Sequence, residues 1–184
     1  MTAVVDNPQG WDIGLKIGPR PRLKTLGFLD ATMVITLQRP EEGAQGVGIK
    51  CDEFGIEWVN KPLDSRDSVL QSPAGREEFK RVKEVADFVD AKIKEKHRIY
   101  LHCAAGIHRT GMVTYAWLLH LGFDHSTALG LLGWFRPAII ADESVHPKLN
   151  LLRKFLTKEE PSWMNLPASS DAGRTLGQLA RTAN

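Results

Sequence analysis

The stretch HCAAGIHRTG, from His102 to Gly111, decides the fold because it joins an apolar strand to a helix through a short loop. The apolar run Ile99 to Leu101 precedes it, and a helical pattern follows Arg109. A short loop at a helix N-terminus can turn its N–H groups inward, and such a nest binds a tetrahedral dianion. Gly106 permits this turn of the backbone. The stretch therefore predicts a phosphate-binding loop at the carboxyl end of a strand.

Two side chains of this loop suit an attack on phosphorus. Cys103 begins the loop and Arg109 ends it, with five residues between them. The inward N–H groups and the guanidinium favour a thiolate on Cys103 at neutral pH. The planar guanidinium donates to two phosphate oxygens at once, which a lysine cannot do. Together with the strand before it, Gly106 in the turn and Thr110 after it, this pattern indicates a cysteine-dependent phosphatase rather than a buried structural cysteine.

The same residues resemble the signature of the dual-specificity branch of the protein tyrosine phosphatases, in which HC is followed by five residues, Arg, and Ser or Thr. The chain is thereby identified as an atypical small member. The resemblance implies that Cys103 becomes phosphocysteine and that Arg109 binds the phosphate. It also implies that Thr110 donates to the cysteine sulfur and that His102 supports the loop. The phosphate would be bound by the backbone N–H groups of Ala104, Ala105, Gly106, Ile107, His108 and Arg109.

The family also takes a general acid from an aspartate in a loop before the preceding helix. Asp64 and Asp67 occupy this place, within PLDSRD. Family members often place the acid three positions after the proline, which falls on Ser65 here. Counting back from Cys103 favours Asp67, whereas counting forward from the strand favours Asp64, and we slightly prefer Asp67. Either carboxylate could instead cap a helix or pair with Arg66.

Strands and helices alternate along the chain, which predicts an α/β fold with a mostly parallel central sheet flanked by helices. The resemblance implies the same fold, that of the protein tyrosine phosphatases. We expect strands over 31–37, 56–60 and 98–102, and helices over 76–96, 109–121, 126–135 and 147–156. An extended arm over 1–22 should precede the phosphatase domain over 23–157. A flexible tail over 158–184, which could dock a partner, should follow it.

Length and composition are those of an ordinary globular domain, with 184 residues, 42% of them apolar and 25% charged. The net charge of +2 is too small to predict a nucleic-acid partner. No stretch has the roughly 20 apolar residues of a membrane span, and the N-terminus lacks the pattern of a signal peptide. We therefore expect a cytoplasmic protein, with a nuclear location also compatible, and neither a metal nor a cofactor.

The sequence holds two cysteines, too few for a disulfide framework. Cys51 is expected in the core, with a reversible disulfide to oxidised Cys103 as the alternative. His108 is expected at the rim of the pocket, either merely exposed or in contact with substrate.

The first functional hypothesis is hydrolysis of phosphotyrosine and phosphoserine or phosphothreonine in proteins. A second is a non-protein substrate, such as an RNA 5′ end, an inositol phosphate or a glucan. The loop has no lysine between Cys103 and Arg109, which disfavours highly charged substrates. A third hypothesis, a phosphate-recognising binding module without turnover, is disfavoured because Cys103 and Arg109 are both present.

Overall fold

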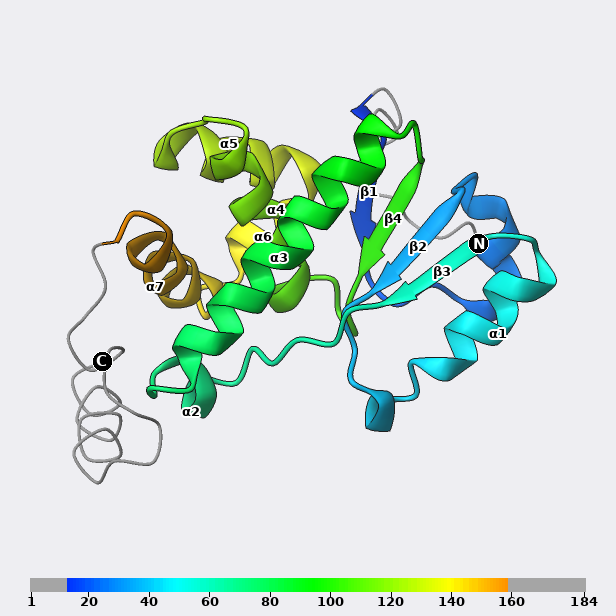
Figure 1. Ribbon diagram of the computed structural model, residues 1–184, viewed down its shortest axis with the longest axis horizontal. Helices are drawn as coiled ribbons and strands as arrows, with labels where there is room; N and C mark the ends of the chain where they lie inside the picture. The colour runs from blue at the N-terminus through cyan, green and yellow to red at the C-terminus, as the bar shows by residue number, and fades with distance from the viewer. Residues whose placement is uncertain (1–12, 159–184) are drawn as a thin grey trace.

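A parallel sheet of four strands organises the computed structural model, which describes residues 13–158 (Figure 1). The strands are β1 (Leu15–Gly18), β2 (Met33–Thr36), β3 (Glu57–Asn60) and β4 (Ile99–His102), in the order β1-β4-β2-β3. Every neighbouring pair is parallel, so all carboxyl ends meet at one edge. The register aligns His102 with Gly18 on one side and with Thr36 on the other. Cys103 therefore leaves the sheet between two flanking strands.

Helices lie on both faces of this sheet (Figure 1). The helical elements are η2 (Leu23–Leu29), η3 (Pro40–Glu42), α1 (Gln45–Glu53), α2 (Asp67–Leu70), α3 (Gly75–Lys94), α4 (His108–His120), α5 (His125–Phe135), α6 (Pro137–Ala141) and α7 (Val145–Leu156). Side chains alternate along β4, with Ile99 and Leu101 facing one way and Tyr100 the other. The larger apolar cluster lies under α3, α4, α5 and α7, and the smaller one under η2 and α1. α4 is buried over most of its length because its sequence is apolar on most sides.

The α/β class and the mostly parallel central sheet flanked by helices, both predicted from the sequence, are confirmed. The predicted strands at 31–37, 56–60 and 98–102 correspond to β2, β3 and β4, and the four predicted helices correspond to α3, α4, α5 and α7.

Several elements were not predicted, among them β1, α1, α2 and α6. β1 lies inside the expected N-terminal arm, and all four of its residues are buried by pairing with β4. No helix was predicted between 37 and 56, but α1 lies there, because its two glycines and weak apolar periodicity do not indicate a helix from the sequence. The loop-like segment after β3 contains α2, and α6 follows α5. Residues 1–12 of the arm and 159–184 of the tail lie outside the described residues. Among residues 13–158, no helix is long and apolar enough to cross a membrane.

Candidate active site

The loop between β4 and α4 has the shape that phosphate binding requires. Cys103 is 3% exposed at its start, and Gly106 adopts a left-handed φ of 69°. A Cβ on Gly106 would lie 2.2 Å from the carbonyl carbon and oxygen of Gly18, so the loop rests directly on the end of β1. Within the described part of the chain, the N–H groups of 104–109 donate to no other residue. These donors are therefore available for an anion, and their binding of phosphate stays a prediction.

A buried chain of hydrogen bonds supports the base of this loop. His102 is fully buried, and burial lowers its pKa to about 4, so the imidazole is neutral. Its Nδ1 lies 3.0 Å from the carbonyl oxygen of Cys103. That oxygen can only accept, so Nδ1 carries the proton and Nε2 accepts from the Thr36 hydroxyl at 2.8 Å. Trp58 donates in turn to the Thr36 oxygen at 2.9 Å. His102 therefore links β3 and β2 to the loop, which agrees with its predicted supporting role.

Arg109 is held by a carboxylate from the loop after β2. Its Nη1 and Nη2 donate to the two oxygens of Glu42 at 2.6 and 2.7 Å, and Nη1 also donates to the Leu37 carbonyl at 3.3 Å. Glu42 is oriented from behind by the backbone N–H of Arg39 at 2.9 Å. Hydrogen bonds from Arg109 lower the pKa of Glu42 to about 2. The carboxylate is therefore ionised, and it opposes the cost of burying the guanidinium.

Sequence reasoning missed Glu42. A signal was available, because Glu41 and Glu42 follow the carboxyl end of a predicted strand, the edge where open α/β sheets gather their ligands. The contact itself spans 67 residues of sequence, so only the folded chain reveals it.

The two acid candidates have different surroundings. Both oxygens of Asp64 accept from Nε of its neighbour Arg66, at 3.0 and 2.9 Å, and Arg39 lies 3.6 Å away. Burial raises the pKa of Asp64, but the Arg66 hydrogen bonds outweigh it and the net pKa is lowered. The alternative that Asp64 pairs with Arg66 is thus the observed one.

Asp67 begins α2, and its Oδ1 accepts from Nζ of Lys148 on α7. Its side chain is 57% exposed, whereas that of Lys148 is 6% exposed. Of the two aspartates, Asp67 has the more exposed side chain, since that of Asp64 is 15% exposed. Lys148, like Glu42, was not singled out from the sequence.

His108 lies at the rim of the loop, as predicted. Its Nε2 lies 2.8 Å from Oγ of Ser144, and that hydroxyl donates to Asp142 at 2.6 Å. Because the one hydroxyl proton of Ser144 goes to Asp142, Nε2 of His108 must donate. Burial and the charge of Lys148 lower the pKa of His108. His108 is thus a neutral, oriented side chain.

The predicted hydrogen bond from Thr110 to the sulfur of Cys103 is not formed. The Thr110 hydroxyl is fully buried, and no described residue accepts from it or donates to it. Cys51 lies in the smaller apolar cluster and Cys103 in the larger one, on opposite faces of the sheet. Within residues 13–158, no three His, Cys, Asp or Glu side chains are grouped to hold a metal ion.

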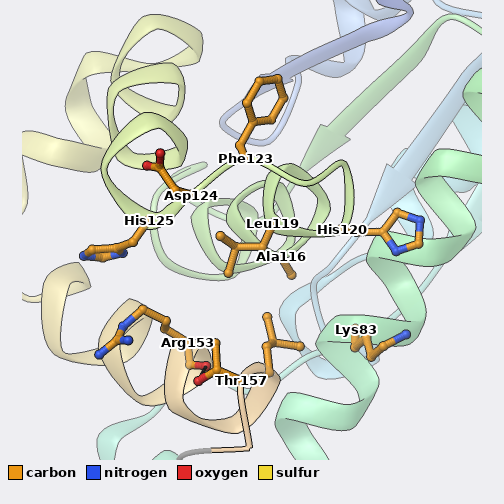
Figure 2. A pocket seen from close by; sticks show the side chains of 10 residues that line it. Lys83, Ala116, Leu119, His120, Phe123, Asp124, His125, Arg153 and Thr157 are labelled. Carbon is orange, nitrogen blue, oxygen red and sulfur yellow. Dashed lines mark hydrogen bonds between the residues drawn. The ribbon is translucent and has the colours of Figure 1, made fainter.

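A separate hollow of about 450 Å³ lies at the other end of α4 (Figure 2). It is lined by Lys83, Ala116, Leu119, His120, Phe123, Asp124, His125, Arg153, Leu156 and Thr157. None of these residues belongs to the phosphate loop or to its partners.

Comparison with known proteins agrees with this geometry. A family profile described as "Dual specificity phosphatase, catalytic domain" matches residues 64–155, which include the loop and both aspartates. Among curated proteins, none matches the chain.

Several solved structures share the fold. Tk-PTP in its active form aligns with a TM-score of 0.55 and 19% identity, over 74% of this chain and 88% of that one. PTPMT1 aligns with a TM-score of 0.58 and 18% identity, over 80% and 92%. The PP-IP phosphatase SIW14 from S. cerevisiae, in complex with citrate, aligns with a TM-score of 0.53 and 14% identity, over 77% and 80%. At such identities the likeness shows the fold alone.

Proposed function

Because this chain belongs to the dual specificity phosphatase family and is therefore a phosphatase, we propose that it dephosphorylates proteins through a phosphocysteine intermediate. The substrates would carry phosphotyrosine and phosphoserine or phosphothreonine. The observation that carries the proposal is that Cys103 and Arg109 stand at the two ends of a loop whose N–H groups donate to no described residue. A thiolate nucleophile also requires a reducing compartment, so we place the protein in the cytoplasm.

The reaction would proceed in two steps. The thiolate of Cys103 attacks phosphorus, the bond from phosphorus to the leaving oxygen breaks, and Asp67 gives that oxygen its proton. Water then attacks phosphorus in the phosphocysteine, and its proton passes to Asp67. The bond from phosphorus to sulfur breaks, which releases inorganic phosphate and restores the thiolate. Throughout, Arg109 and the loop N–H groups stabilise the charge on the phosphoryl oxygens.

We assign the acid to Asp67 because an acid needs an oxygen that can carry a proton toward the substrate. Both oxygens of Asp64 accept from Arg66, so neither is free to carry a proton toward the substrate. Asp67 gives one oxygen to Lys148 and is more than half exposed.

A non-protein phosphate ester is the second candidate. Lys148 and Arg136 bring positive charge near the loop, and Arg136 donates to the carbonyl oxygen of Ala105 at 3.2 Å. One relative in fold, SIW14 from S. cerevisiae, is titled a PP-IP phosphatase and so is named for a substrate other than a protein. Against this candidate, Lys148 is already paired with Asp67, and the loop itself holds no lysine. Phosphopeptides and inositol phosphates compared at equal concentration should favour the peptides.

The deciding experiment measures hydrolysis of 4-nitrophenyl phosphate with chelator and reductant present. Cys103→Ser should lose at least about a thousandfold in rate, because its hydroxyl is a far weaker nucleophile than a thiolate. Cys51→Ala, which removes the other thiol from the opposite face of the sheet, should keep the wild-type rate. If Cys103→Ser retained its activity, the catalytic proposal would be wrong and phosphate-dependent binding would become the leading account.

A further inference from the structure

Lys148 is unusual because it is a cation inside the protein. It is 5% exposed, in the first half of α7, and burying an ammonium is costly unless a partner compensates it. The partner in the described structure is Oδ1 of Asp67, 81 residues earlier in the chain. Because Lys148 is buried, its positive charge acts mainly on the carboxylate of Asp67 rather than on solvent.

The contact fixes which oxygen of Asp67 can take part in proton transfer. A protonated carboxyl carries its hydrogen on one oxygen and accepts through the other. Because Lys148 occupies Oδ1, the proton must be carried by Oδ2. The ammonium therefore selects a single orientation for the acid, whereas an unheld, exposed aspartate would populate several rotamers.

The same contact joins Asp67 to the helix whose start also meets the phosphate loop. The charges of Lys148 and Asp67 both act on His108, the residue directly before Arg109. His108 is in turn joined through Ser144 to the turn that starts α7. Asp67 and the phosphate loop are thus both held by α7, which packs along α4.

We propose that Lys148 is a positioning residue that holds Asp67 in the orientation needed to protonate the leaving group. This inference rests on the proposed function and on Asp67 as its acid. It assigns a part of the reaction to α7, which carries no residue of the phosphate loop.

Leaving-group dependence tests the inference, because a poor leaving group needs the acid and a good one does not. The assay compares 4-nitrophenyl phosphate with phenyl phosphate for wild type, Asp67→Asn and Lys148→Met. Asp67→Asn should lose about a hundredfold or more in kcat on phenyl phosphate and far less on 4-nitrophenyl phosphate. Lys148→Met should lose about tenfold in kcat on phenyl phosphate and less on 4-nitrophenyl phosphate, and its KM should not change. Lys148→Arg should recover part of the rate on phenyl phosphate because it keeps a donor.

Two controls separate positioning from folding. Lys80→Met, at an exposed site on α3, should leave both substrates unaffected. Inhibition by vanadate, which reports the phosphate loop, should be the same in Lys148→Met as in wild type. The double variant Asp67→Asn/Lys148→Met should be no slower than Asp67→Asn, because Lys148 acts through Asp67.

Other outcomes would overturn the inference. Lys148 would have a structural role only if Lys148→Met lowered kcat equally on both substrates. The same would follow if the double variant Asp67→Asn/Lys148→Met were slower than Asp67→Asn by the full factor lost in Lys148→Met. If Lys148→Met failed to fold, equal losses on both substrates in Lys148→Arg would lead to the same conclusion. An Asp67→Asn variant without leaving-group preference would remove Asp67 as the acid, and Lys148 with it, while leaving the nucleophilic role of Cys103 intact. Failure of the proposed function itself would appear separately, as a Cys103→Ser variant that keeps its rate.

Discussion

Arg109 shows how one side chain can be both held and left ready for substrate. A guanidinium has five N–H donors, and Glu42 takes one from Nη1 and one from Nη2. Nη1 directs a further, weaker contact to the Leu37 carbonyl. Nε takes no part in the contact with Glu42, so the edge that Nε shares with Nη2 would face the phosphate oxygens. Glu42 thus orients the guanidinium of Arg109 through Nη1 and Nη2 and leaves its Nε side for phosphate.

Replacing Glu42 with glutamine should therefore impair catalysis. The amide has nearly the same shape, but it is uncharged and turns an NH₂ group toward the guanidinium donors. We expect kcat/KM for 4-nitrophenyl phosphate to fall roughly ten- to a hundredfold, because Arg109 loses its fixed orientation. The neighbouring Glu41→Gln, whose side chain is 63% exposed, is the matched control and should behave as wild type. Equal rates for both variants would show that Arg109 needs no partner.

The same variant carries a pH prediction for stability. The pKa of Glu42 falls from 4.5 to about 2 on folding, so its ionised form stabilises the fold fully above pH 4.5 and progressively less as the pH falls toward 2. The Tm of wild type should exceed that of Glu42→Gln at pH 6, and the gap should narrow by pH 3. A gap that stayed constant over this range would contradict the ionic contact.

At the scale of elements, the phosphate loop depends on β1 as well as on β4 and α4. The loop closes over the end of β1, where Gly106 approaches the backbone of Gly18 and Arg20 donates from its N–H to the Ala104 carbonyl at 2.9 Å. Two backbones can come this close only where no side chain intervenes. β1, which lies in the segment predicted to be an extended arm, therefore forms one wall of the site.

Gly106→Ala tests this close approach. An alanine there would have to adopt a left-handed φ, which costs about 1–2 kcal/mol. Its Cβ would also lie 2.2 Å from the backbone of Gly18, too close for van der Waals contact. Gly55→Ala is the matched control, because Gly55 has a φ of 66° but open space around it. Gly106→Ala should lower Tm more than Gly55→Ala and should also weaken vanadate inhibition. If the two variants were equally stable and bound vanadate equally well, the contact with β1 would not matter.

At the scale of the whole molecule, the sheet divides the interior into two apolar clusters. Cys103 belongs to the larger cluster and Cys51 to the smaller one, with the sheet between them. Burial raises the pKa of the Cys51 thiol to about 11, so it is neutral at physiological pH. The disulfide considered from the sequence would require one cysteine to cross the sheet, which the fold does not allow.

Oxidation of the native protein should confirm this separation. After treatment with peroxide, mass spectrometry should find no peptide in which Cys51 is joined to Cys103, and Cys51 should be recovered as a free thiol after unfolding. Protein unfolded before alkylation is the control, in which Cys51 should react. A peptide in which Cys51 is joined to Cys103, recovered from the folded protein, would contradict the placement of the two cysteines on opposite faces of the sheet.

Local patterns in the sequence determined much of this protein. The loop signature at 102–111, the amphipathic period of α3 and the β-branched run of β2 each depend on residues close together in the chain, so they could be read without the fold. They were sufficient for the α/β class, three of the four strands, and the positions of Cys103 and Arg109.

The tertiary structure alone decided how those groups are held. Glu42 meets Arg109 across 67 residues and Lys148 meets Asp67 across 81, and β1 is a strand because it pairs with β4. A charged residue has the same local signature whether it faces water or a buried partner. The choice of partner depends on distances that exist only after the chain has folded.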